Sequence, residues 1–129
     1  MSYHFSKIIK GKSFNDTIEY VTAALKVEGF GVLTEIDIQA TLKKRINIDM
    51  KQYKILGACN PQFAYKAITA EDKIGVFLPC NVVVQEHENG MIEVSAVDPI
   101  ASMVSVQNEG LAPIAAEVQQ KIKRVIYSL

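Results

Sequence analysis

Hydrophobic residues recur at helical spacing near the start of the chain and again at its end. The segment from about Phe14 to Glu28 follows Ser13, a good N-cap, and precedes Gly29, which suits the left-handed position that ends a helix. Its apolar side is formed by Phe14, Ile18, Val21 and Leu25. A final helix is predicted from about Glu109, with an apolar stripe of Leu111, Ile114, Val118, Ile122, Val125 and Leu129. Both helices therefore need an apolar layer to cover.

Shorter apolar runs bounded by turn residues predict strands and three further helices. Strands are expected at about 3–9, 31–36 and 53–58. Asp37 is placed to cap a short helix whose apolar side is Ile38, Leu42 and Ile46. Asn60-Pro61 and Asp98-Pro99 each combine a capping residue with a proline that fits the first helical position. The second of these helices should reach about Val106.

The strongest local signal is a β-hairpin. A long strand from Ile74 to His87 is predicted to pair with Met91 to Val97, because Asn89-Gly90 between apolar runs favours a tight hairpin turn. Pro79 lies inside the first strand and removes a backbone donor, which indicates a bulge or an edge at that point.

These elements follow the order strand, helix, strand, helix, strand, helix, strand, strand, helix, helix. The antiparallel hairpin and the one-sided helices predict an α+β fold, with helices packed on one twisted, mostly antiparallel sheet. Residues 1–129 are expected to form a single domain, because a chain of 129 residues can bury a sizeable core.

Composition narrows the class of partner. Hydrophobic residues make up 49% of the chain, and fourteen basic residues balance fourteen acidic ones. This neutrality removes the general attraction on which nucleic-acid or anionic-membrane binding rests, so neither partner is expected. The N-terminal residues lack the apolar stretch of a signal peptide, and no apolar run approaches the roughly 18 residues of a spanning helix. We therefore expect a soluble, cytoplasmic protein.

Candidate chemistry is concentrated at two cysteines. Cys59 directly precedes the predicted helix at Pro61, where the positive end of the helix dipole would stabilise a thiolate. Cys80 follows Pro79 at the predicted strand irregularity. Taken alone, each cysteine is more simply explained as a small buried side chain that fills an apolar gap.

The two sites resemble one another, since each is a Cys-Asn dipeptide beside a proline: Cys59, Asn60, Pro61 and Pro79, Cys80, Asn81. If the two sulfur atoms share a recess, three outcomes stay open: a redox dithiol, a soft-metal site, or two thiols that line a ligand pocket. The spacing is not Cys-x-x-Cys, so neighbouring strands would have to bring the cysteines together. A closed zinc site is disfavoured, because only His4 and His87 are available as further nitrogen ligands.

Other motifs have simpler explanations. The sequence contains no P-loop, Gly-x-Gly-x-x-Gly or nucleophile elbow, and no cofactor is expected. The basic trio at positions 43–45 lies at the end of a predicted helix, where cations are intrinsically favourable.

Three parts of the chain match the motifs of a known family: Gly57-Ala58-Cys59-Asn60-Pro61, Ile74-Gly75-Val76 with Leu78-Pro79-Cys80-Asn81-Val82, and Asp98-Pro99. Through these motifs the chain resembles the domain-of-unknown-function 302 family. The resemblance implies a compact α+β fold related to the TATA-binding-protein-like arrangement, commonly found as a dimer. It implies no particular reaction.

Our leading hypothesis is a non-catalytic, homodimeric domain that binds a small molecule or a partner near Cys59 and Cys80. The first alternative is a thiol enzyme or redox protein that uses Cys59 as the attacking thiolate and Cys80 as the resolving thiol. The second is a soft-metal-binding domain, or a purely structural dimerising domain.

Overall fold

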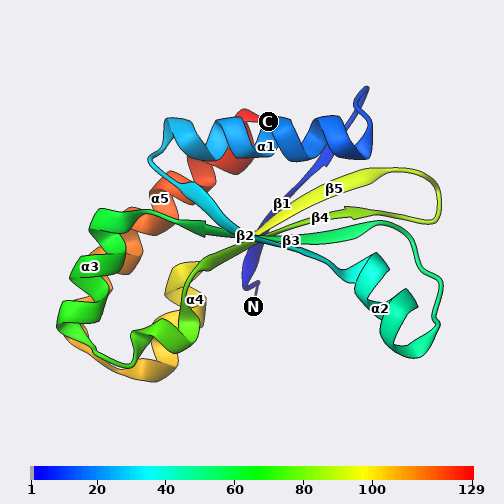
Figure 1. Ribbon diagram of the computed structural model, residues 1–129. Coiled ribbons are helices and arrows are strands. Elements are labelled where there is room, and N and C mark those ends of the chain that lie inside the picture. Colours follow the sequence, from blue (N-terminus) through cyan, green and yellow to red (C-terminus); the bar gives the residue numbers. More distant parts are fainter. Residues whose placement is uncertain (1) are drawn as a thin grey trace.

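One antiparallel sheet runs through the centre of the protein (Figure 1). The computed structural model describes residues 2–129. The five strands are β1 (His4–Ile9), β2 (Gly31–Asp37), β3 (Tyr53–Cys59), β4 (Cys80–Glu86) and β5 (Ile92–Val97). They are arranged in the order β1-β5-β4-β3-β2, and each strand is antiparallel to its neighbours. The predicted α+β class and antiparallel sheet are confirmed.

The helices are α1 (Phe14–Val27), α2 (Ile38–Ile46), α3 (Pro61–Ala70), α4 (Pro99–Met103) and α5 (Ala112–Ser128). Figure 1 shows α1 and α5 on one face of the sheet, with α2 near one end of the sheet and α3 and α4 near the other. The first and last helices of the chain thus lie side by side, in agreement with their mutual contacts.

The main core lies between the sheet and the pair α1 and α5. Alternate side chains of β4 and β5 are buried there, among them Val82, Val84 and Val94. They pack beneath buried residues of the two helices: Val21, Leu25, Ile122, Val125 and Ile126. Burial of each such side chain contributes about 1.5 to 3 kcal/mol, so this layer is the main stabilising feature of the fold.

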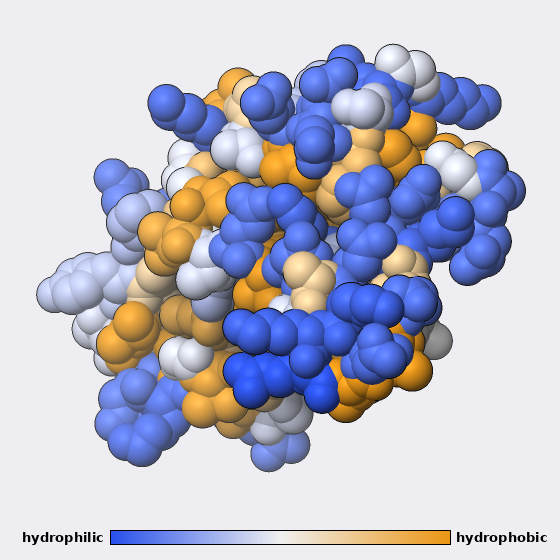
Figure 2. Space-filling view, turned by 45° about the vertical axis from the view of Figure 1, so that its right-hand side comes forward, coloured by the Kyte–Doolittle hydropathy of each residue, from blue (hydrophilic) through white to orange (hydrophobic). Residues whose placement is uncertain are grey.

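The opposite face of the sheet is more polar. The hydroxyls of Ser6 and Ser95 are hydrogen-bonded at 2.8 Å across the β1–β5 pair, and His4 Nδ1 lies 2.8 Å from Ser6 Oγ. This alternation of buried apolar and outward polar residues is typical of an antiparallel sheet with one covered face. A space-filling view shows hydrophilic and hydrophobic side chains interspersed over one side of the protein (Figure 2).

Local capping chemistry explains most of the helix starts. Ser13 accepts a hydrogen bond from the backbone N–H of Asp16, and Asp37 accepts one from Ala40. Asp98 likewise accepts a hydrogen bond from the backbone N–H of Ile100 at the start of α4. Gly29 adopts a positive φ of 87° just after α1, as its position predicted.

Asn60 departs from the capping prediction. It occupies the N-cap position of α3, but its side chain makes no capping hydrogen bond. Its amide Nδ2 instead donates to the carbonyl oxygen of Glu28 at 3.4 Å. This hydrogen bond holds the amide toward the end of α1, and Oδ1, the atom that would cap, accepts no hydrogen bond from the first turn of α3.

The predicted hairpin is confirmed, but its first strand is shorter than expected. β4 begins at Cys80, so the prediction of a strand from Ile74 was wrong for the residues that precede it. Residues Ile74–Phe77 form a short 3₁₀ helix, and Ile74 is buried with Ala67 and Leu111. Proline at position 79 cannot donate to the ladder, so pairing starts only after it.

The predicted apolar side of α2 is less buried than expected. Ile38 and Leu42 are half-buried, and Ile46 is exposed. Figure 1 shows this helix beyond one end of the sheet, which explains why it buries none of its residues. Among residues 2–129, none of the helices combines the length and apolar character that crossing a bilayer requires.

Candidate functional site

A cavity of about 260 Å³ lies at the end of the sheet where β3 ends and β4 begins. Residues of α3, α4 and α5 form its other walls, together with residues at the start of β2. The lining is Phe30, Leu33, Ala58, Cys59, Asn60, Phe63, Ala64, Ala67, Ile68, Leu78, Pro79, Cys80, Pro99, Met103, Ile114, Ala115 and Val118. None of these residues is charged, and Asn60 supplies the only amide side chain. The site is therefore an apolar recess with a few polar groups, which is typical of small-molecule sites.

Both cysteines line this cavity. The β3–β4 register pairs Ala58 with Cys80, so Cys59 is offset from Cys80 by one residue on the neighbouring strand. Cys59 is half-buried, whereas Cys80 is only 9% exposed, and both are free thiols. The structure thus places the two sulfur-bearing side chains around one recess.

The environment of Cys80 favours the neutral thiol. Burial, and secondly the charge of Cys59, raise the pKa of Cys80 from 9.0 to about 11. Removing a thiolate from water is costly, and a second negative charge nearby adds to that cost. Cys80 therefore stays protonated at neutral pH.

The remaining residues singled out from the sequence lie in three different places. Asn60 and Pro79 line the cavity beside the cysteines. Pro61 is exposed at the first position of α3, outside the lining. Asn81 lies on the open face of the sheet, where it lines a separate shallow hollow with Tyr53 and Gln85.

Gly57 explains how Pro79 can lie so close to β3. A side chain at position 57 would collide with the ring of Pro79 and with the hydroxyl of Thr34. The glycine thus lets the residues before β4 pack tightly against the end of β3. This packing helps to position Cys80 at the cavity wall.

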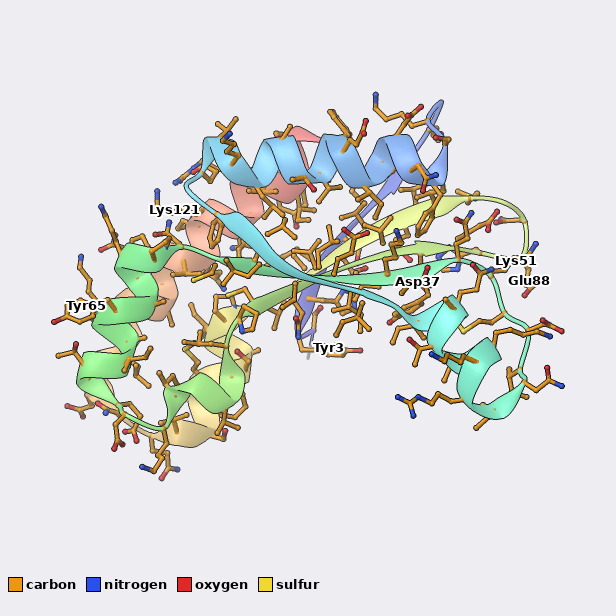
Figure 3. All side chains as sticks on the ribbon, in the orientation of Figure 1. Tyr3, Asp37, Lys51, Tyr65, Glu88 and Lys121 are labelled. Carbon is orange, nitrogen blue, oxygen red and sulfur yellow. The ribbon has the colours of Figure 1, made fainter. Side chains whose placement is uncertain are left out.

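Two lysine side chains lie over Phe63, which lines the cavity. The ring of Phe63 lies beneath two ammonium groups, with Lys66 Nζ at 5.4 Å and Lys121 Nζ at 5.9 Å from its centroid. Figure 3 shows Lys121 near the upper end of α3 and Tyr65 projecting outward from that helix. Cation–π contacts of this kind help to fix the Phe63 ring that closes one wall.

Sequence reasoning missed most of the cavity wall. Met103 and Pro99 reach it from α4, and Ile114, Ala115 and Val118 reach it from α5. The amphipathic pattern of α5 indicated a buried stripe, but no local signal distinguished the residues that border a cavity from those that fill the core. Met103 carried no signal of its own.

The histidines lie apart from this site. His87 Nε2 is 2.9 Å from Glu93 Oε1 near the hairpin, and neither histidine lines the cavity. Within residues 2–129, no group of three or more His, Cys, Asp or Glu side chains is arranged to hold a metal ion. The basic residues of positions 43–45 lie in the last turn of α2, as predicted.

Comparison with known proteins identifies the family. The family model described as domain of unknown function DUF302 matches residues 5–129. A crystal structure of an uncharacterised conserved DUF302 protein from Bacillus stearothermophilus is similar, with 28% identity, 98% of each chain covered and a TM-score of 0.90. No curated protein matches the chain. The resemblance carried by the cysteine motifs is thereby confirmed, and the chain belongs to the DUF302 family.

Proposed function

We propose that this protein is a non-catalytic binding domain whose cavity takes a small, uncharged and predominantly apolar molecule. The observation that carries this proposal is the recess at the end of the sheet, which has no charged residue in its lining. A charged ligand would lose its hydration there without gaining a partner of opposite charge. The amide of Asn60 and the two thiols are the groups available to orient a polar atom of the ligand.

The volume of the cavity limits the size of the ligand. An apolar cavity of about 150 Å³ is large enough to bind benzene, so about 260 Å³ corresponds to roughly ten non-hydrogen atoms. This is below the range of most drug-sized ligands. A bicyclic aromatic molecule or a short branched chain fits this limit.

Thiol chemistry is the second candidate, because both cysteines border the same recess. The raised pKa of Cys80 counts against it as a nucleophile, since the thiolate is the reactive form. A resolving thiol must also lose its proton before it attacks. Ligand binding makes no such demand, so we place it first.

Indole is a suitable probe, because it is flat, apolar and close to the size limit. Calorimetry and thermal unfolding are carried out on the full chain and on two variants. Ala64→Leu adds side-chain volume at the cavity wall, and Ala116→Leu adds the same volume at an exposed position of α5. Indole should bind to the wild type and to Ala116→Leu and should raise their Tm.

Ala64→Leu should bind indole at least about tenfold more weakly, because the added carbon atoms occupy the space that the probe needs. Equal binding to both variants, or no binding to the wild type, contradicts the proposal. If the wild type does not bind indole, we infer that the cysteines are core residues of a structural domain.

We further propose that the chain acts as a single cytoplasmic domain and self-associates as a homodimer. Two free thiols suit a reducing compartment. The open face of the sheet carries the half-buried apolar side chains of Ile55 and Val83, which a second copy would cover. Sedimentation equilibrium tests the dimer, and a monomer at micromolar concentration contradicts it.

A further inference from the structure

A second hollow, of about 490 Å³, adjoins the apolar cavity described above. It is lined by residues of α4, of the two 3₁₀ turns that follow α4, and of the first turn of α5. Met103 and Ala115 line both spaces, so the two are neighbours. We call the first space the inner cavity and the second the outer hollow.

We propose that the inner cavity and the outer hollow form one binding site for an unbranched, uncharged alkyl chain that ends in a hydroxyl group, as in a long-chain alcohol. The chain fills the inner cavity, passes Met103 and Ala115, and continues into the outer hollow. This inference rests on the proposed function, because the inner end of the chain occupies the same cavity.

The two side chains at the junction suit the passage of an alkyl chain. Ala115 is buried on α5 and carries only a methyl group. Met103 is half-buried at the end of α4, and a methionine side chain is unbranched with three rotatable bonds. A change of its rotamer lets Met103 pack along an alkyl chain while α4 and α5 stay in place.

The outer hollow offers apolar surface that continues that of the inner cavity. Leu111 is buried in its lining, whereas Ile100 and Val104 are exposed there. An alkyl chain that leaves the inner cavity would cover these two side chains and lose its own contact with water. Removal of apolar area from water favours binding in proportion to the area covered, so each further methylene group strengthens the complex.

The polar residues of the outer hollow select the head group. The exposed amide of Gln107 can donate a hydrogen bond to a hydroxyl group and accept one from it. Within residues 2–129, no lysine, arginine or histidine lines either space, and the carboxylate of Glu109 lies at the outer hollow. A carboxylate head would therefore lose hydration without a cationic partner and would be repelled by Glu109.

The test is calorimetry of the full chain with straight-chain alcohols from 1-hexanol to 1-dodecanol. The affinity of the wild type should rise about fourfold for each added methylene group throughout the series, because each one leaves water for apolar surface. 1-Dodecanol has more non-hydrogen atoms than the inner cavity holds, so a rise that continues to this alcohol requires the outer hollow.

Two alanine variants provide a matched comparison. Ala112→Leu adds side-chain volume in the outer hollow, and Ala116→Leu adds the same volume at an exposed position outside both spaces. Ala112→Leu should bind 1-hexanol and indole as the wild type does, and 1-dodecanol at least about tenfold more weakly. Ala116→Leu should bind all three as the wild type does.

Dodecanoate tests the head group, because it has the same chain length as 1-dodecanol and carries a negative charge at neutral pH. It should bind to the wild type at least about tenfold more weakly than 1-dodecanol. Equal binding of the two would show that the outer hollow does not discriminate against an anion and would overturn the assignment of the ligand class.

The proposal is overturned if the affinity of the wild type levels off once the inner cavity is full, or if the two alanine variants bind 1-dodecanol equally. Circular dichroism reports whether each variant is folded. If Ala112→Leu does not fold, the alcohol series and dodecanoate decide the question on the wild type. Indole separates this inference from the proposed function, because indole binding without a continued rise leaves the inner cavity as a site and removes only its extension.

Discussion

Gly57 and Pro79 are in such close contact that an ideal Cβ at position 57 would lie 2.8 Å from Pro79 Cγ. The same Cβ would lie 2.2 Å from the hydroxyl oxygen of Thr34 on the other neighbouring strand. Neither a proline ring nor a β-branched threonine side chain can move away easily. The close approach of three strand segments at the cavity therefore depends on the missing side chain.

Gly57→Ala should destabilise the protein by about 1 to 3 kcal/mol, the usual cost of overpacking a tight site. Gly31→Ala is the matched control, because Gly31 is also in a strand and a Cβ there meets no atom within 4 Å. We expect the control to change the free energy of unfolding by less than about 1 kcal/mol. Urea denaturation measures both values, and equal costs would show that Pro79 can move aside.

Stability should fall at high pH because of Cys80. Its folded-state pKa of about 11 lies above the ordinary value of 9.0, so between these values the folded state holds a proton that the unfolded chain has lost. The contribution is fully present below about pH 9 and is lost as the pH rises through about 11. Its size is of the order of 2 kcal/mol.

Urea denaturation of the wild type and of Cys80→Ala between pH 8 and pH 11, roughly the range of the shift, checks this contribution. Lysine and tyrosine side chains titrate in both proteins, so the difference between the two pH profiles isolates Cys80. Parallel profiles would show that burial does not raise the pKa of this thiol.

The two cysteines should differ in their reaction with iodoacetamide at pH 7.5. Cys59 is half-buried, whereas Cys80 is buried. With a pKa of about 11, Cys80 is a thiolate in fewer than roughly one molecule in a thousand at that pH. Mass spectrometry of proteolytic peptides should therefore find the label on Cys59 first. Labelling of Cys80 at the same rate would contradict the described burial.

Capping provides a test at two helix starts. Ser13→Ala removes a capping hydrogen bond of 3.0 Å and should cost about 1 kcal/mol. Asn60→Ala removes only the long hydrogen bond to Glu28 and should cost less, because the Asn60 side chain does not cap α3. Thermal unfolding compares the two variants, and a larger cost for Asn60→Ala would indicate that it caps the helix in solution.

Helix starts and the hairpin turn could be predicted from the sequence, because they depend on residues that are close together in the chain. Ser13, Asp37 and Asp98 cap helices as expected, and Gly90 adopts the positive φ that the Asn-Gly turn requires. Ile74 was misassigned because its 3₁₀ helix packs against Leu111, which is distant in sequence. Contacts between residues that are distant in sequence cannot be predicted from the local pattern of hydrophobic residues.

The candidate site was predictable only in part, for the same reason. The irregular chemistry around Cys59 and Cys80 identified two positions, and the β3–β4 register then relates them in space. Asn81 was grouped with Cys80 because they are neighbours in sequence, yet successive residues of a strand point to opposite faces. The contribution of Met103 depends on how α4 folds back, which no spacing in the sequence encodes.

Leu33 lies at the irregularity in β2 where the register with β3 shifts, and it borders the cavity while 68% exposed. β2 is an edge strand, held by hydrogen bonds to β3 alone within the sheet. We therefore expect that local opening of this edge segment, with the buried helices in place, is sufficient for the proposed ligand to enter or leave the recess. We expect a bound molecule to exchange at the rate at which the sheet edge opens locally, which is much faster than the rate of global unfolding.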